Sequence, residues 1–128
     1  MIKLLNPATL HPPGSVHSHA VEVTAGSNLL FFSGQIGMRV DGSVPDSLAE
    51  QSQQVYANLD ALLAAHGLDA GALVKLSLFV VSGQDMQTVR AARAKFLGPH
   101  RPASTAMFVS QLVDPAWLVE VEAIAARS

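Results

Sequence analysis

The sequence predicts an α+β domain in which two helices cover one face of a mixed β-sheet, with the elements in the order β-β-β-α-β-α-β-β. Three observations lead to this prediction. Alternating apolar and polar residues near both ends of the chain are typical of half-buried strands. Two segments with helical periodicity lie between those ends, and a long apolar run separates them. No linker, repeat or low-complexity stretch divides residues 1–128, so we expect a single domain.

Three short strands are predicted in the first third of the chain: residues 1–5, 16–23 and 29–33. Pro12, Pro13 and Gly14 favour an irregular loop between the first two strands, because proline has no backbone N–H to donate. Gly26-Ser27-Asn28 predicts a hairpin turn that leads from the second strand into the third. We therefore expect these two strands to pair.

The first helix is the clearest element of the sequence. Ser47 and Glu50 have the spacing of a capping box, and Gly67 ends the helix. Its apolar stripe consists of Leu48, Val55, Leu59, Leu62 and Leu63. The apolar run that follows, residues 73–81, favours a central strand that is buried on both faces.

The second helix is predicted from Asp85 to Leu97, and Gly98 ends it. Its inward-facing residues are Met86, Val89, Phe96 and Leu97. Residues 105–112 form the next strand, and Asp114-Pro115 turns the chain into the last one. Two helices cover only one face of the sheet, so we expect self-association to cover the other.

The last strand, residues 119–125, carries two acids among apolar residues. Its core-facing residues are expected to be Val119, Val121, Ala123 and Ala125. Glu120 and Glu122 share the opposite face with Ile124. Only 14% of the chain is charged, which makes these carboxylates candidates for a general acid or base. An antiparallel strand with one solvated face explains the same pattern more simply.

Composition excludes several classes of function. Hydrophobic residues make up 49% of the chain and the mean hydropathy is +0.31, so we expect part of the apolar surface at a subunit interface. The formal charge of −2 and the absence of a basic run argue against a nucleic-acid partner. The lack of cysteine excludes disulfides and thiolate catalysis.

No apolar run approaches the ~18 residues of a membrane span and no signal peptide is evident, so we expect a cytoplasmic protein without a membrane partner.

Three groups of residues are candidates for chemistry. Ser33-Gly34-Gln35-Ile36-Gly37 follows a strand directly and could present backbone N–H groups to an anion, although a simple turn has the same pattern. His17 and His19 share a strand face, as two metal ligands would, but no third ligand stands at a recognisable spacing, and we expect no metal. Ser33, Ser104 and Thr105 are possible nucleophiles without an assignable His-acid pair, which argues against a serine hydrolase.

Taken together, these segments resemble the RidA/YjgF family of reactive-intermediate deaminases, which is also called the endoribonuclease L-PSP family. The resemblance covers nearly the whole chain. It is carried by Ser33-Gly34-Gln35-Ile36, the helix over residues 51–67, Val74-Lys75, Arg101-Pro102-Ala103 and the strand over residues 119–125. The last of these motifs is the most specific.

The resemblance implies a chorismate-mutase-like fold and a homotrimer with a barrel core. It also implies three clefts between subunits that bind small carboxylate or imine ligands. The reaction it implies is the cofactor-free hydrolysis of enamines and imines to a carbonyl product and ammonia. In that reaction Glu120 would help to activate water, and Ser33 and Gly34 would line the cleft.

The sequence departs from the family pattern at three positions of this cleft. Ser104, which precedes Thr105, stands where the family has its carboxylate-binding arginine. His17 replaces a tyrosine, and Arg90 replaces an asparagine on the second helix. Arg90 either restores the lost positive charge or is a solvated helix residue. We therefore expect an altered substrate preference, with a non-catalytic ligand-binding trimer as the alternative and RNA cleavage as the weakest candidate.

Overall fold

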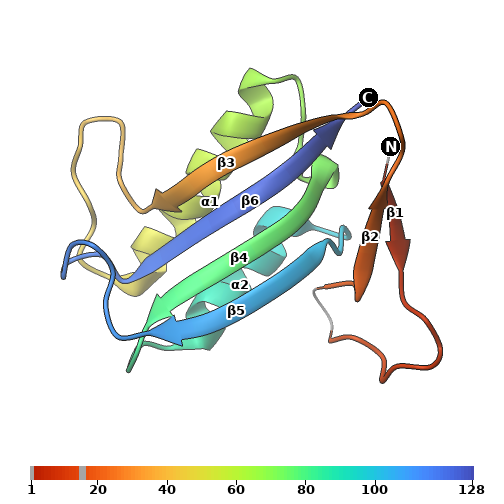
Figure 1. Ribbon diagram of the computed structural model, residues 1–128. Coiled ribbons are helices and arrows are strands. Elements are labelled where there is room, and N and C mark those ends of the chain that lie inside the picture. Colours follow the sequence, from red (N-terminus) through yellow and green to blue (C-terminus); the bar gives the residue numbers. More distant parts are fainter. Residues whose placement is uncertain (1, 15–16) are drawn as a thin grey trace.

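The computed structural model describes residues 2–14 and 17–128, so the predictions made for Met1, Ser15 and Val16 lie outside the described residues. The described chain contains six β-strands, two α-helices and one short 3-10 helix (Figure 1). The strands are β1 (Ile2–Leu5), β2 (Ala20–Val23), β3 (Asn28–Ile36), β4 (Leu73–Val81), β5 (Ala103–Val109) and β6 (Val119–Arg127). The helices are α1 (Leu48–Ala65), η1 (Ala70–Ala72) and α2 (Met86–Leu97).

The main sheet has four strands in the order β3-β6-β4-β5. β6 runs antiparallel to both of its neighbours, whereas β4 and β5 are parallel, so the sheet is mixed. Figure 1 shows α1 and α2 packed side by side against one face of this sheet, and the contacts between them agree. The predicted α+β class, with two helices on one face of a mixed sheet, is confirmed.

Side-chain alternation in β6 places the core between sheet and helices. Val119 and Val121 are fully buried on the helix-facing side, while Glu120 on the opposite face is half-buried and Glu122 is exposed. The expected division of this strand into a core face and an acidic face is confirmed. We refer to the sheet face that carries Glu120 and Glu122, away from the helices, as the open face.

β4 differs from its prediction. Leu76, Leu78 and Val80 are fully buried against the helices, but Ser77 and Phe79 on the open face are only half-buried. The expectation of a strand buried on both faces is wrong for the single chain. The reason is that the helices cover only one side of the sheet, and a continuous apolar run cannot reveal from sequence which side will be covered.

The helix ends follow their predicted signals. The side chain of Ser47 accepts a hydrogen bond of 3.2 Å from the backbone N–H of Glu50. The Glu50 carboxylate lies 3.7 Å from the Arg39 guanidinium, so it pairs with the preceding loop. Asp85 caps α2 by accepting from the N–H of Gln87, and Gly98 ends that helix with a φ of 58°.

The predicted pairing of the second and third strands is wrong. β2 pairs antiparallel with β1 in a separate two-stranded ribbon, and β3 pairs with β6 in the main sheet. The turn before Asn28 therefore joins a strand of one sheet to a strand of another. The residues of such a turn are the same as those of a hairpin turn, so the sequence does not distinguish the two. β2 also begins at Ala20 and not at residue 16, so His17 and His19 precede the strand.

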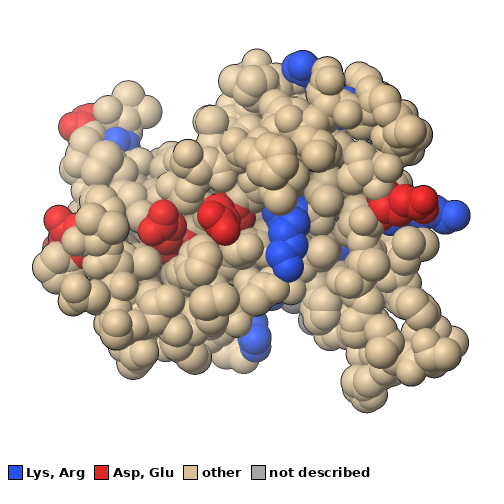
Figure 2. Space-filling view, viewed as in Figure 1, with Lys and Arg blue, Asp and Glu red and all other residues tan. Residues whose placement is uncertain are grey.

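The open face of the sheet exposes large apolar side chains. Phe31, on β3, is 70% exposed, and Leu29 and Met107 are each more than 40% exposed. Figure 2 shows this side of the molecule as mostly uncharged, with the acidic and basic side chains confined largely to one band across its middle. No helix within residues 2–14 and 17–128 is long and apolar enough to cross a membrane.

Candidate functional site

Glu120 and Gly34 lie against each other on the open face. Strand β3 is irregular between Phe32 and Gln35, where Ser33 and Gly34 interrupt its register with β6. A Cβ atom built on Gly34 would overlap the Glu120 carboxylate, so only glycine allows the carboxylate to occupy this place. Sequence analysis assigned both residues to one site, and the fold brings them together across two neighbouring strands.

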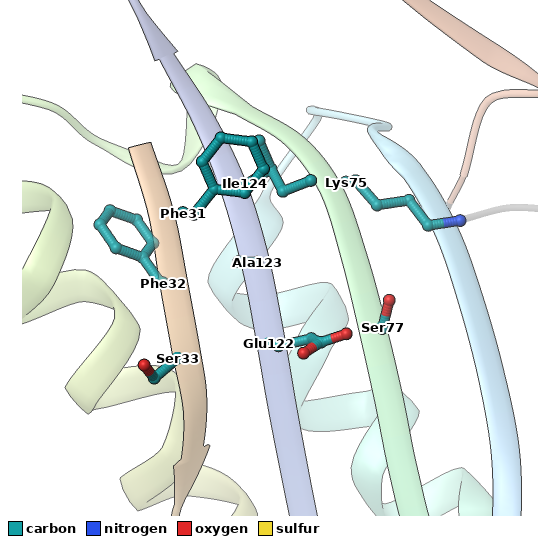
Figure 3. A pocket seen from close by; sticks show the side chains of 8 residues that line it. All are labelled: Phe31, Phe32, Ser33, Lys75, Ser77, Glu122, Ala123 and Ile124. Carbon is teal, nitrogen blue, oxygen red and sulfur yellow. The ribbon is translucent and has the colours of Figure 1, made fainter. Parts of the chain in front are cut away.

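A hollow of about 270 Å³ lies further along the open face, and neither Glu120 nor Gly34 lines it (Figure 3). Glu122 and Ser77 project towards each other in it from neighbouring strands, and Ser33 lines its β3 side. Lys75, at the other end, donates a hydrogen bond of 2.9 Å to the hydroxyl of Thr105. Thr105 thus belongs to the open face.

A second hollow, of about 640 Å³, lies between α2 and the edge strand β5. We call it the α2–β5 pocket. Its lining consists of Gly14, His17, Gln87, Arg90, Ala91, Arg93, Ala94, Ser104 and Ala106. Three of the predicted binding residues, His17, Arg90 and Ser104, meet here although they come from distant parts of the sequence. None of the described residues that line this pocket is acidic.

His17 is placed in the pocket by its neighbour Ser18. The buried Ser18 donates from its backbone N–H to the carbonyl of Pro102 at 3.1 Å and from its hydroxyl to the carbonyl of Arg101 at 2.5 Å. These two bonds tie the segment that carries His17 to the start of β5. Ser104 follows two residues after Pro102, so both side chains line one pocket.

His19 does not join His17 in a metal site within the described structure. Their rings lie 6.0 Å apart, edge to face. The His19 Nε2 atom instead makes a hydrogen bond of 2.6 Å with the carbonyl oxygen of His11. In the part of the chain that the structure describes, no group of three His, Cys, Asp or Glu side chains is arranged to hold a metal ion.

Arg93 is the residue of this pocket that sequence analysis missed. Its side chain is only 3% exposed, and its Nη1 donates a hydrogen bond of 3.0 Å to the Ser104 hydroxyl. Its Nε has no hydrogen-bond partner among the described residues. A signal was present in the sequence, because position 93 lies four residues after Val89 and four before Leu97, within the buried stripe of α2. Arg90, at the exposed edge of that stripe, was singled out instead.

Positive charges accumulate in the α2–β5 pocket. Burial is the main cause that lowers the pKa of Arg93; Tyr56 opposes it, and Arg90 adds a smaller lowering effect. The pKa of His17 is lowered by burial first, and then by His19 and Arg93. Among the described residues no carboxylate pairs with these cationic groups, and a pocket with such an excess of positive charge favours an anion.

The fold separates the predicted site residues into two groups. Ser104 faces α2, since it stands in register with the buried Leu76, whereas Thr105 and Glu120 face the open side. Gly34 and Glu120 lie near the β3 edge of the sheet, and the α2–β5 pocket lies at the β5 edge. A single chain therefore does not bring Glu120 together with Ser104, Arg90 or His17.

Comparison with known proteins gives consistent results. The model of the endoribonuclease L-PSP family matches residues 10–127. The 2-iminobutanoate/2-iminopropanoate deaminase of Escherichia coli strain K12 is 34% identical over 124 residues, which cover 94% of this chain and 95% of that protein. Among solved structures, the Rid-family protein YyfB of Yersinia pestis, whose function is unknown, superimposes with a TM-score of 0.84 at 30% identity over 97% of both chains. TdcF of Escherichia coli with bound serine has a TM-score of 0.73 at 26% identity, over 98% of this chain and 99% of that one.

Proposed function

We propose that this chain, which belongs to the endoribonuclease L-PSP (RidA/YjgF) family, is a reactive-intermediate deaminase. The reaction that we assign to it is the hydrolysis of imines of small carboxylic acids without a cofactor. The observation that carries this proposal is the Glu120 carboxylate packed over Gly34. A carboxylate held half-buried on the open face can act as a general base towards a water molecule that approaches from that side. The deaminase relatives make the imine the first substrate class to consider.

The proposed reaction needs one group that accepts and returns a proton. Glu120 accepts a proton from water while the water oxygen bonds to the imine carbon, and the C=N electron pair moves to nitrogen, which takes up the proton that Glu120 accepted. The resulting carbinolamine loses ammonia when its hydroxyl proton passes through Glu120 to the departing nitrogen. The products are a ketoacid and ammonia, and no redox step is involved.

We also propose that the complete site forms between copies of this chain in a homotrimer. The Glu120–Gly34 pair and the α2–β5 pocket lie towards opposite edges of the sheet, so a ring of copies that places the β5 edge of one chain beside the β3 edge of the next would join them. The exposed apolar side chains of the open face, such as Phe31, support burial of this face in the same ring.

The activity is tested by ketoacid release from imines generated in situ from small, bulky, acidic and basic amino acids. We expect the protein to accelerate release for at least one class over the uncatalysed rate. Heat-denatured protein serves as the control for trace contaminants. Uncatalysed rates across the whole panel would overturn the deaminase assignment.

The assembly is tested by sedimentation equilibrium at micromolar concentration. We expect the mass of a trimer of the 13.5 kDa chain. Replacing Phe31 by glutamate should shift the equilibrium towards monomer, because it places a charge on the apolar open face. A wild-type monomer at this concentration would contradict the shared site.

A second candidate is a trimer that binds a small metabolite without turnover. The observation that favours it is Ser104 in place of the family arginine. The relative TdcF was solved with serine bound, which places a small amino acid on a protein of this fold. Tight binding of a ketoacid together with an inactive imine panel would favour this second function.

A further inference from the structure

In the described part of the chain, Arg93 is a buried cation without an anionic partner. Its side chain is 3% exposed, and within residues 2–14 and 17–128 no Asp or Glu carboxylate pairs with it. Its only side-chain hydrogen bond in the described structure goes to the neutral hydroxyl of Ser104. A buried charge is costly unless it is paired, so this guanidinium is suited to an anion supplied from outside the chain.

The Arg93 guanidinium contacts the side chain of residue 104. One terminal nitrogen of the guanidinium lies 3.0 Å from the Ser104 hydroxyl. Arg93 on α2 therefore places a positive charge next to position 104, where the family has its carboxylate-binding arginine. The Nε atom of Arg93 has no hydrogen-bond partner among the described residues, so one N–H donor of the planar guanidinium is unused. A guanidinium fork matches a carboxylate with two parallel hydrogen bonds, which a lysine or serine cannot reproduce.

The pocket holds more positive charge than one carboxylate requires. Arg90 lies one turn before Arg93 on α2 and lines the same pocket, as does His17. No acidic side chain among the described lining residues balances these groups. A ligand with two carboxylates would pair with both arginines, whereas a ligand with one would leave one arginine without an anion.

We propose that Arg93, positioned by Ser104, binds the ligand's 2-carboxylate in this chain, and that Arg90 binds a second carboxylate and so selects dicarboxylic imino and keto acids. This inference deepens the proposed function and rests on it. It gives Ser104 a positioning role, because its hydroxyl contacts Arg93, and it assigns the substrate class to imines derived from acidic amino acids.

The inference is tested by isothermal titration of the full-length protein with two keto acids, 2-oxoglutarate and 2-oxobutanoate, which differ by the second carboxylate. We expect 2-oxoglutarate to bind at least about 10-fold more tightly, the effect of one additional charged hydrogen bond. R93M should weaken binding of both acids by roughly 10- to 100-fold, because it removes the shared contact while keeping an apolar stem. R90Q should remove the preference, because it weakens binding of 2-oxoglutarate more than binding of 2-oxobutanoate.

K95Q is the matched control, since it removes a positive charge from the same helix at an exposed position outside the α2–β5 pocket. It should leave both affinities unchanged. Equal affinity for the two acids in the wild type, or normal binding by folded R93M, would overturn the inference. If R93M does not fold, R93K is measured instead. Lysine keeps the positive charge but lacks the planar guanidinium, so R93K is expected to bind both acids several-fold more weakly. Unchanged binding by R93K would overturn the inference.

Measuring ligand binding and imine turnover on the same variants distinguishes a failure of this inference from a failure of the proposed function. A preference for 2-oxoglutarate that R90Q removes, together with an inactive imine panel, would overturn the deaminase assignment and support the binding pocket. Hydrolysis that favours imines of small apolar amino acids and is unchanged in R93M would support the deaminase and overturn the pocket's proposed selectivity.

Discussion

Replacing Glu120 by glutamine is expected to lower the rate of imine hydrolysis by roughly 10²- to 10⁴-fold, the usual contribution of a positioned general base. Glutamine keeps the shape that packs over Gly34 but cannot accept the proton of the attacking water. Ketoacid release from the imine that the wild type uses best measures the effect. The thermal midpoint should change little, because the substituted side chain is only half-buried.

Glu122→Gln is the matched control for this prediction. Glu122 is on the same strand and the same face, two residues further along, but it is exposed and lines the hollow with Ser77, away from Gly34. We expect its activity to stay within a few-fold of the wild type. A comparable loss of hydrolysis rate in both variants would show that the rate depends on the negative charge of the open face in general. The assignment of Glu120 as the general base would then be wrong.

Replacing Gln51 by leucine is expected to lower the free energy of unfolding by about 3 kcal/mol, because buried backbone groups lose their partners without a change in side-chain size. Gln51 is fully buried in α1 and donates to the carbonyls of Pro45 and Ala116, each at 2.9 Å. Its oxygen accepts from the N–H of Leu118, also at 2.9 Å. One side chain thus joins the loop before α1 to the turn that leads into β6 and Glu120.

The loss is measured by urea denaturation of both proteins under identical conditions. Gln53→Leu, the same substitution at an exposed position of the same helix, is the control and should change stability by less than about 0.5 kcal/mol. A Gln51→Leu variant as stable as the wild type would mean that water replaces the lost partners. The structure makes this an unfavourable outcome, since Gln51 has no exposed surface.

The helices and their ends could be predicted because their signals are local. Gly98 adopts a positive φ where the sequence predicts a stop, and Asp85 and Ser47 cap the helices that they precede. The division of β6 into two faces was predictable for a similar reason, since alternation along a strand is fixed by its geometry. The ribbon of β1 and β2 was not predictable, because strand pairing depends on which distant edge is free.

Within the candidate site, the approach of Glu120 to Gly34 agrees with the sequence motifs, whereas Arg93 was missed. An arginine in a buried helical stripe can be recognised from sequence as unusual, but its partner cannot. That partner, Ser104, is brought to it by the parallel pairing of β5 with β4. The separation of Ser104 from Thr105 follows from the same pairing, which turns neighbouring residues to opposite faces.

The sequence by itself determined the fold class, the helix boundaries, the two faces of β6 and the resemblance to a family, because each depends on residue order or on local backbone geometry. The tertiary structure alone decided which charges meet. Arg93 and Ser104 lie eleven residues apart and His17 is far from both along the chain, yet all three line one pocket. Such pockets form where separate elements pack, and packing is a property of the whole chain that no local pattern encodes.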